Sequence, residues 1–469
     1  MSNPMRAIPL LRPLLHLLPL AFFLLGGCAV GPAYVKPTTP EPLAFKEAQG
    51  WSPAAPADAL DRGPWWMLFN DPVLNELAAQ VEVSNQNVAA AVASYAQARS
   101  QVAQQRAALF PSVSLSTSGE RSGTRNAGAD NNYRLNIGTS WEPDLWGRLR
   151  ASVGAASANA QASAADLASA RLSAQGELAA NYFVVRQTDA QAALLATTIE
   201  GYQRVLQITG NRFDAGIATK SDVLQAQTQL SNARIDALSL ARQRAQFEHA
   251  IAVLLGKAPA DFSLASAPWQ AFVPEIPVGV PSALLQRRPD IAAAERRVAS
   301  ANEQIGIARS AYYPNIGLSA SVGNSGSRVS DLFSASSALW SFGLSAVQTL
   351  FNAGATRASV AGAEASQQAA VARYRQTVLD AFGDVENQLS ATRVLAQQLV
   401  LRREASDSAD QVEAQILNRY KAGQVSYSEV VQAQASALSA RRALVQAQGD
   451  RQSTAISLIQ ALGGGWQAQ

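Results

Sequence analysis

Few residues in this chain combine the type and the spacing that catalysis requires. The 469 residues include one cysteine, Cys28, and two histidines, His16 and His249. His249 lies in the helix-forming run QFEHAIAVLLG, where a packed or surface histidine is the ordinary outcome. No cluster of His, Cys and carboxylate residues has the spacing of metal ligands, and no glycine-rich phosphate loop occurs. We therefore expect no enzyme, no metal site and no bound cofactor.

Cys28 is the residue whose surroundings indicate a specific reaction. Arg6 and Arg12 precede a leucine-rich run that ends in LLGGC, and this order of positive, apolar and small residues is typical of a secretory signal. The run is too short and too interrupted by proline for a comfortable transmembrane helix. LLGGC resembles the lipobox of bacterial lipoproteins, in which the signal, here residues 1–27, is removed and the cysteine thiol is acylated. A plain signal peptide with an incidental cysteine is the alternative.

The lipobox resemblance has two further implications. It implies a covalent lipid, an N-acyl diglyceride with palmitate, on Cys28. Because Ala29 rather than an aspartate follows, the sorting pattern of such lipoproteins implies the outer membrane as the destination.

Composition argues against a nucleic-acid partner. The chain is 48% hydrophobic and 16% charged, whereas a typical soluble domain is roughly 25% charged. Without residues 1–27, which hold two arginines and no acidic residue, 36 basic residues face 35 acidic ones. This balance gives no basic footprint for nucleic acid, and a single cysteine excludes internal disulfides.

The chain contains one distinctive segment twice. NRFDAGIATKSDVLQAQ occupies 211–227, and NRYKAGQVSYSEVVQAQ occupies 418–434. A proline-rich bridge lies between the two halves. Because the period is too long for a solenoid, the pattern indicates a two-copy duplication.

Each copy shows the same order of expected elements. A long Ala- and Gln-rich helix comes first, then a pair of strands, then a very long helix, and finally a helix that runs back. The expected helices lie at about 73–109, 148–209 and 220–255 in the first copy and at about 281–311, 355–417 and 427–462 in the second. The chain thus divides into the signal 1–27, an anchored extended segment 28–72, a first repeat 73–256 with strands at about 112–119 and 132–141, a bridge 257–281, a second repeat 282–462 with strands at about 315–323 and 339–348, and a tail 463–469.

The strands alternate between apolar and polar residues in the manner of membrane strands. Val113, Leu115 and Thr117 alternate with serines, and the run from Trp340 to Ala346 alternates in the same way. Lengths near ten residues suit a tilted transmembrane strand, and aromatic residues stand where a girdle would lie. Two ordinary soluble hairpins packed on a core are the alternative. If the strands do span a membrane, four cannot close a barrel, so several chains must share one.

The duplicated segment itself predicts a helix, a tight turn and a second helix. Gly216 and Gly423 are suited to the left-handed conformation that ends a helix. The runs Thr219–Asp222 and Ser426–Glu429 fit the capping box that begins one. Each copy therefore ends in a helical hairpin with its turn at the tip.

These features together resemble the outer membrane factor family, the TolC-like efflux channels, and in particular the NodT-type outer membrane lipoproteins of RND efflux systems. The resemblance covers residues 28–465. Its most specific segments are LLQRRPDIAAAERRVASANEQIGIARSAYYPNI at 284–316, DPVLNEL at 71–77, the two turns and the lipobox.

The resemblance implies an α+β membrane protein built from a duplicated repeat of long antiparallel helices plus two strands each. Three copies would form a homotrimer with a 12-stranded β-barrel in outer membrane lipid and a periplasmic α-helical tunnel. A periplasmic membrane-fusion adaptor and an inner-membrane RND pump are the implied partners. The implied adaptor contacts at the tips are Ala215, Gly216, Ile217, Ala422, Gly423 and Gln424, and the implied candidates for the periplasmic gate are Asp222, Tyr420 and Glu429.

We therefore expect a passive exit duct in the outer membrane for drugs or other toxic small molecules. A duct for protein secretion driven by an ABC transporter is a second hypothesis. A structural envelope lipoprotein is a third, and the alternating strands with their aromatic residues argue against it. The position of Glu429 also fits a role as a helix cap, and this weakens its assignment to the gate.

Overall fold

A computed structural model describes residues 29–39, 42, 44–47, 64–124, 127–276 and 287–464. The expected signal 1–27 and its cysteine, Cys28, lie outside the described residues, as do parts of the segment 28–72, part of the bridge and the end of the tail. Within the described ranges, no helix is both long enough and apolar enough to cross a membrane.

The chain forms two compact units, and each draws on both copies of the repeat. The first unit contains residues 1–38, 94–164 and 293–375, and the second contains 39–93, 165–292 and 376–469. The two longest helices, α4 (Arg148–Asp214) and α8 (Ala355–Lys421), contribute to both units. The duplication is therefore interleaved in space, because neither unit corresponds to one copy.

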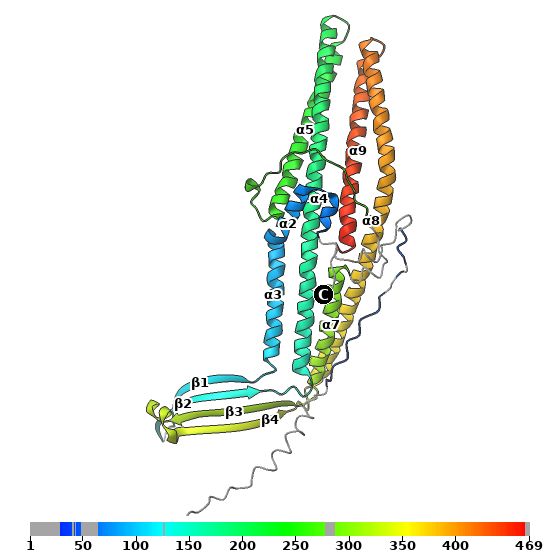
Figure 1. Ribbon diagram of the computed structural model, residues 1–469. Helices are drawn as coiled ribbons and strands as arrows, with labels where there is room; N and C mark the ends of the chain where they lie inside the picture. The colour runs from blue at the N-terminus through cyan, green and yellow to red at the C-terminus, as the bar shows by residue number, and fades with distance from the viewer. Residues whose placement is uncertain are drawn as a thin grey trace, which may run out of the picture. The chain divides into compact units, whose positions relative to one another are not determined.

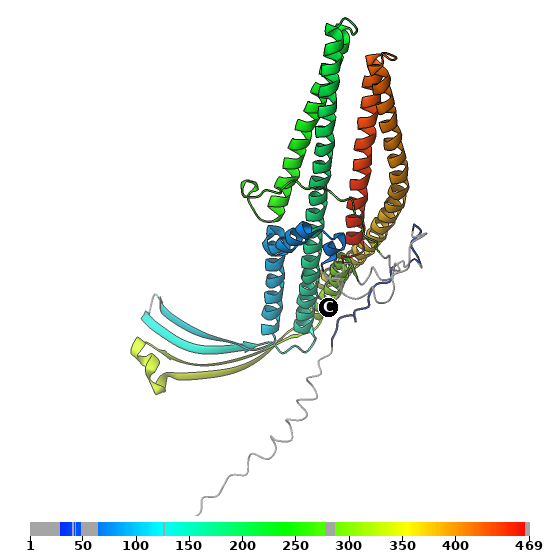
Figure 2. The ribbon, with the colours of Figure 1, turned by 45° about the horizontal axis from the view of Figure 1, so that its top comes forward.

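The first unit contains a single antiparallel sheet of four strands in chain order (Figure 1). The strands are β1 (Ser112–Thr124), β2 (Ala127–Trp141), β3 (Asn315–Gly326) and β4 (Ala338–Val347). Strand pairs β1–β2 and β3–β4 are the two expected hairpins, and pairing of β2 with β3 joins them. Two hairpins from distant parts of the sequence thus make one surface (Figure 2).

The strands are longer than the sequence predicted. The segment between the expected strands 112–119 and 132–141 is largely strand, because the ladder continues through Glu120 opposite Asn132 and Arg121 opposite Asn131. The segment between the expected strands 315–323 and 339–348 also has regular structure, since it holds the short 3-10 helices η5 (Val329–Phe333) and η6 (Ala335–Ser337). Backbone pairing across the hairpin extends both strands beyond the alternating sequence on which the expectation rested.

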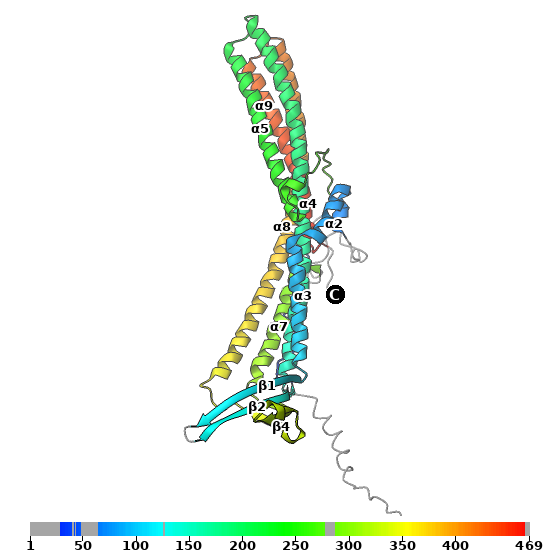
Figure 3. The ribbon, with the colours of Figure 1, turned by 90° about the vertical axis from the view of Figure 1, so that its left-hand side faces the viewer.

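The second unit contains the two helical hairpins. Helix α4 turns into α5 (Lys220–Leu254), and α8 turns into α9 (Tyr427–Ala461), as Figures 1 and 3 show. Helices α4 and α8 both have 67 residues, and α5 and α9 both have 35. The two copies are therefore identical in the length of every hairpin element.

The expected first helix at 73–109 is wrong in one respect, because it is broken. It consists of α2 (Pro72–Ser84) and α3 (Gln86–Ala107), separated by Asn85 in an extended conformation. The buried Asn85 side chain accepts from the backbone N–H groups of Asn87 and Val88, and it donates to the Leu254 carbonyl at 2.8 Å. The amide thus starts α3 and ties it to the end of α5, and this outweighs the helix propensity of the flanking residues.

The helix expected at 281–311 is α7, and it spans Pro289–Ser310. Pro289 is the first residue of this helix, a position where proline is favoured. Residues 281–286 of the expected span lie outside the described residues. Before Pro289, the description of the chain begins at Arg287.

Aromatic side chains form much of the second unit's core near η3 (Trp65–Phe69). Phe69 packs on Phe183 with ring centroids 5.0 Å apart, and Phe183 packs on Tyr182 at 5.4 Å. The Tyr182 hydroxyl donates to Asp71, the residue that caps α2, at 2.7 Å. Burial, together with the bond to Asp71, raises the pKa of Tyr182 to about 12. The N-terminal segment is thereby fixed to α4.

Candidate duct wall and hairpin tips

The four-stranded sheet has one apolar face and one polar face. Register places Leu115, Ile137, Val322 and Trp340 in one row across the sheet. The expected alternation is therefore confirmed, because apolar side chains from both hairpins share one face. Several of them are exposed, including Leu115 at 69%, Trp340 at 82% and Phe342 at 71%.

Mostly small polar side chains cover the opposite face, together with a few charged ones toward the β1–β2 connection. Ser140 lies between Ser112 and Ser319, and Ser321 lies opposite Ser341, with hydroxyl oxygens 2.8 Å apart. Serine and glycine leave the backbone close to whatever passes that face, and they carry no charge. This face suits the wall of an aqueous passage, whereas the apolar face suits lipid.

Both hairpin tips have the geometry that the duplicated sequence predicts. Gly216 has φ of 73° and Gly423 has φ of 77°, both left-handed. The Ile217 N–H donates to the Arg212 carbonyl, and the Gln424 N–H donates to the Arg419 carbonyl. These bonds close a Schellman motif at each tip, so glycine is required there by the backbone.

The helices that leave the tips begin with acidic caps. The Asp222 carboxylate accepts from the Thr219 backbone N–H at 2.9 Å, and the Thr219 hydroxyl accepts from the Asp222 N–H at 3.2 Å. In the second copy, Glu429 accepts from the Ser426 N–H at 3.1 Å. Both carboxylates thus have a structural role as helix caps, as the capping-box pattern of the two runs predicted.

Just below the turns, the two hairpins share a small core. It contains Val205, Ala226, Tyr420, Tyr427 and Val430, drawn from all four helices. The rings of Tyr420 and Tyr427 lie 5.5 Å apart. Burial raises the pKa of the Tyr427 hydroxyl, so it is neutral at physiological pH. This layer holds one hairpin against the other.

Arg212 makes a direct connection between the tips, and sequence analysis did not single it out. Its guanidinium donates to the Tyr420 carbonyl at 2.9 Å and lies 4.7 Å from the centre of the Tyr420 ring. It thereby satisfies a carbonyl in the last turn of α8, where a cation is favoured. The sequence does contain a signal for this residue, because the pair Asn-Arg occurs in both copies of the duplicated segment.

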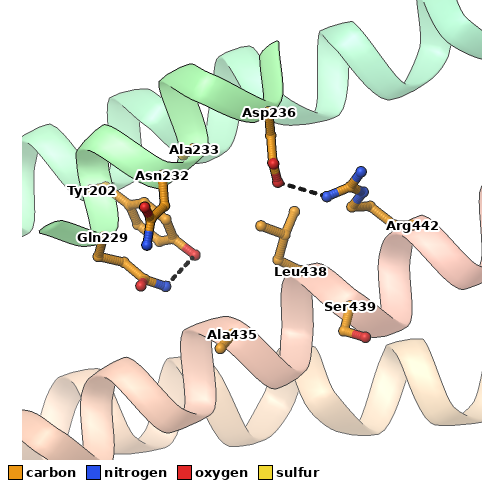
Figure 4. Close-up of a pocket in the computed structure, with 9 residues that line it drawn as sticks. All are labelled: Tyr202, Gln229, Asn232, Ala233, Asp236, Ala435, Leu438, Ser439 and Arg442. Carbon is orange, nitrogen blue, oxygen red and sulfur yellow. Dashed lines mark hydrogen bonds and ion pairs between the residues drawn. The ribbon is translucent and has the colours of Figure 1, made fainter. Parts of the chain in front are cut away.

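A cleft of about 340 Å³ separates the hairpins farther from the tips (Figure 4). Residues of α4, α5 and α9 line it, and the Arg442 guanidinium donates to the Asp236 carboxylate at 2.7 Å across it. Gln229 donates to the Tyr202 hydroxyl at 3.3 Å, and burial raises the pKa of that hydroxyl. Ala233, Ala435 and Ser439 also line the cleft, so its wall combines small apolar side chains with hydrogen-bonding groups.

The candidate site residues from the sequence occupy three different settings. Tyr420 is 4% exposed and lies in the core between the hairpins, whereas Asp222 and Glu429 lie at the starts of α5 and α9. The six candidate adaptor contacts are all exposed and lie in the two turns: Ala215, Gly216, Ile217, Ala422, Gly423 and Gln424. Cys28 lies outside the described residues.

Comparison with known proteins identifies the family. The sequence model of the outer membrane efflux protein family matches residues 77–257 and 280–464. The chain is 32% identical over 461 residues to the toluene efflux pump outer membrane protein TtgC of Pseudomonas putida, covering 95% of this chain and 94% of TtgC. It is 30% identical over 448 residues to the cation efflux system protein CusC of Escherichia coli, covering 94% and 97%.

Solved structures agree with the sequence comparison. The outer-membrane channel OprN superposes with a TM-score of 0.87 at 29% identity, covering 94% of this chain and all of that one. The open state of the MtrE outer membrane channel of Neisseria gonorrhoeae gives a TM-score of 0.84 at 29% identity, covering 94% and 99%.

The chain belongs to the outer membrane efflux protein family. It is the outer-membrane duct of an efflux system, and its helical part lies in the periplasm. The family consists of channels rather than enzymes.

Proposed function

We propose that this protein is a passive exit duct for drugs or other toxic small molecules, working with a periplasmic adaptor and an inner-membrane RND pump. The observation that carries the proposal is the sheet with one exposed apolar face and one polar face of serine and glycine. Such a sheet separates lipid from a water-filled passage. The polar face carries the solute without holding it, because its side chains are small and mostly uncharged.

The open edges of the sheet favour a homotrimer. Among the described residues, strands β1 and β4 each pair on one side only. Unpaired backbone groups cost several kcal/mol each in lipid, so both edges need a partner strand. Three copies joined edge to edge give a closed barrel of 12 strands, and the helical hairpins continue it as a periplasmic tunnel.

The tips are the proposed contact with the adaptor. All six turn residues are exposed, and Gly216 has open space around its α-carbon. A backbone surface with little side-chain bulk allows another helical hairpin to approach closely. Asp222, Tyr420 and Glu429 remain the proposed gate residues, and Tyr420 would act from within the packed layer between the hairpins.

A lipid on Cys28 is the proposed second attachment to the membrane. The first described residues place the neighbouring segment in the first unit. The Val30 N–H points to the Trp146 carbonyl at 3.4 Å, and the Asn302 amide donates to the Pro32 carbonyl at 2.9 Å. A Cys28→Ser variant should lose palmitate labelling, and retained label would exclude acylation at this residue.

Cation export is the one other duct function with specific support. TtgC is named for toluene efflux and CusC for cation efflux, and the chain resembles both over nearly its whole length. We favour organic solutes, because the similarity to TtgC is slightly higher. Protein secretion with an ABC partner would use the same architecture.

The test is to identify the partners and then the cargo. Tagged protein is crosslinked in cells, purified from membranes and analysed by mass spectrometry. Recovery of an RND pump and an adaptor supports the proposal, whereas recovery of an ABC transporter transfers the function to secretion. A deletion strain is then tested for survival in toluene, antibiotics, copper and silver salts. Sensitivity to metal salts alone would replace organic solutes with cations.

A further inference from the structure

The loop between β3 and β4 is a compact structure at the end of the sheet away from the helices of its unit (Figure 1). We call residues 327–337 the outer knob. The Asp331 carboxylate accepts from the Arg328 backbone N–H at 3.0 Å, and the Ser334 hydroxyl donates to the Asp331 carbonyl at 2.9 Å. The Ser337 hydroxyl donates to the Ser334 carbonyl at 2.9 Å. These bonds give the knob a defined shape.

The knob lies over the apolar face of the sheet. Asn324 faces Leu135 and Ala338 in the register, so its side chain continues the apolar row two residues beyond Val322. Its amide donates to the Leu332 carbonyl at 2.8 Å and to the Ser334 carbonyl at 3.1 Å. A Cβ added to Gly326, on the same face, would lie 2.4 Å from the Asp331 Cβ. Both β3 positions therefore hold the knob on this side.

The surface that the knob presents is amphipathic. Phe333 is 81% exposed and Val329 is 56% exposed. Arg328 is exposed, and it forms no ion pair within the described ranges. The exposed ring thus extends the apolar band that includes Trp340, at 82% exposure, toward the end of the strands.

We propose that the outer knob is an interfacial anchor, in which Phe333 and Val329 insert into the outer leaflet and Arg328 binds lipid phosphate. The inference rests on the proposed membrane-spanning barrel. An exposed aromatic residue and an exposed arginine in one short loop suit the boundary between acyl chains and anionic head groups. A second copy of the chain is a poorer occupant, because it would join at the edge strands β1 and β4, whereas η5 lies against the central strands β3 and β2.

The test measures depth with a nitroxide at position 333. Phe333→Cys protein is spin-labelled and reconstituted in vesicles of phosphatidylethanolamine and phosphatidylglycerol. Accessibility to oxygen, which enriches in lipid, is compared with accessibility to a water-soluble nickel chelate. The full-length protein without added cysteine gives the background from Cys28. Two reference variants are Ile137→Cys, on the apolar face of central strand β2, and Ser122→Cys, on the polar face.

We expect the ratio of oxygen to nickel accessibility at 333 to be several-fold higher than at 122. A ratio at 333 equal to that at 122 would place the knob in water and overturn the anchor. Protection from both reagents would place it against protein, and this would also overturn it. If the label at 137 is itself accessible to nickel, the barrel proposal fails independently of the knob.

Asn324→Ala tests the attachment of the knob in the same labelled background. Loss of the two carbonyl contacts should narrow the spectral line at 333 and raise its nickel accessibility, while the signal at 137 stays unchanged. An unchanged line at 333 would show that Asn324 does not position the knob. Repeating the depth measurement in vesicles of phosphatidylcholine, which has the phosphate but no net negative charge, isolates the electrostatic attraction between Arg328 and anionic lipid. The label should lie shallower there, and Arg328→Gln should remove that difference between lipids.

Discussion

The two hairpin tips have the same backbone but opposite side-chain environments. Each turn has five residues between helices of equal length, and each has a left-handed glycine at the same position. Equivalent positions lie 207 residues apart, as Gly216 and Gly423 show. The pairs that differ most in setting are Arg212 and Arg419, Phe213 and Tyr420, and Lys220 and Tyr427.

At the first tip the aromatic side chain lies on the surface. Phe213 is 38% exposed, and the Lys220 ammonium lies 5.4 Å from its ring centre. At the second tip Tyr420 is 4% exposed and Tyr427 is 2% exposed. We infer that the glycine and the caps determine the turn. The first residue of the following helix, lysine in α5 and tyrosine in α9, determines whether the aromatic side chain of the tip is buried.

Arg212 is a second difference between the two tips. It reaches the second hairpin, whereas the equivalent Arg419 is exposed and has no side-chain partner in the described part of the chain. The two copies have therefore diverged: the α4–α5 hairpin supplies the arginine that donates the hydrogen bond, and the α8–α9 hairpin supplies the carbonyl that accepts it.

Gly423→Trp should change efflux more than any other substitution considered for the tips. A side chain in the left-handed region costs about 1–2 kcal/mol, and indole bulk would obstruct the proposed adaptor contact. We expect a folded trimer with efflux abolished, measured as antibiotic susceptibility beside membrane levels of the protein. Lys421→Trp is the control, because it adds the same bulk at an exposed helical position. Wild-type resistance in Gly423→Trp would contradict tip docking.

Exchanging the first residues of α5 and α9, Lys220 and Tyr427, should change the local stability of the two tips by unequal amounts. Tyr427→Lys puts an ammonium into a site where the tyrosine is 2% exposed, which should cost about 3–5 kcal/mol locally. Lys220→Tyr occurs at an exposed site, and it should change stability by no more than about 0.5 kcal/mol. Hydrogen exchange in peptides covering 418–434 and 211–227 reports both. Equal deprotection in the two variants would refute the proposed difference between the tips.

Sequence reasoning succeeded where a local pattern has one structural solution. Gly216 and the run Thr219–Asp222 specify a stop and a start within a few residues, so the turn follows directly. Alternation from Val113 onward specifies a two-faced strand, and the register then places the four strands consistently. In both cases the signal and its cause lie within the same short segment.

It failed where the deciding partner lies far along the chain. The break at Asn85 combines a local helix cap, which the sequence carries, with a bond to Leu254, which is 169 residues away and has no local signal. Burial of Tyr420 depends on Val205 and Tyr427 from other helices. The sequence could place Tyr420 near a tip, but its position inside the inter-hairpin core required the tertiary structure.

Removing the guanidinium tests the asymmetry between Arg212 and Arg419. Arg212→Ala leaves a carbonyl in the last turn of α8 without its charged donor, and it removes the cation from the Tyr420 ring. We expect a loss of about 1–3 kcal/mol in the stability of the tip. Arg419→Ala should cost less than about 0.5 kcal/mol. Amide exchange rates at residues 418–434 distinguish the two, and a larger effect from Arg419→Ala would reverse the assignment.

Removing the hydroxyl group of each helix cap, at Thr219 and at Ser426, should have small and unequal effects on stability. The Thr219 hydroxyl accepts directly from the Asp222 N–H, so Thr219→Ala should destabilise the start of α5 by about 1 kcal/mol. The Ser426 hydroxyl instead bonds the side chains of Ser428 and Glu429, at 2.7 and 3.1 Å. Ser426→Ala should therefore cost less, because the Glu429 carboxylate keeps its bond to the backbone N–H of residue 426. Exchange at the first amides of α5 and α9 measures the difference. Equal losses would mean that both hydroxyls cap the backbone in solution, and the tips would then differ only in their aromatic and arginine side chains.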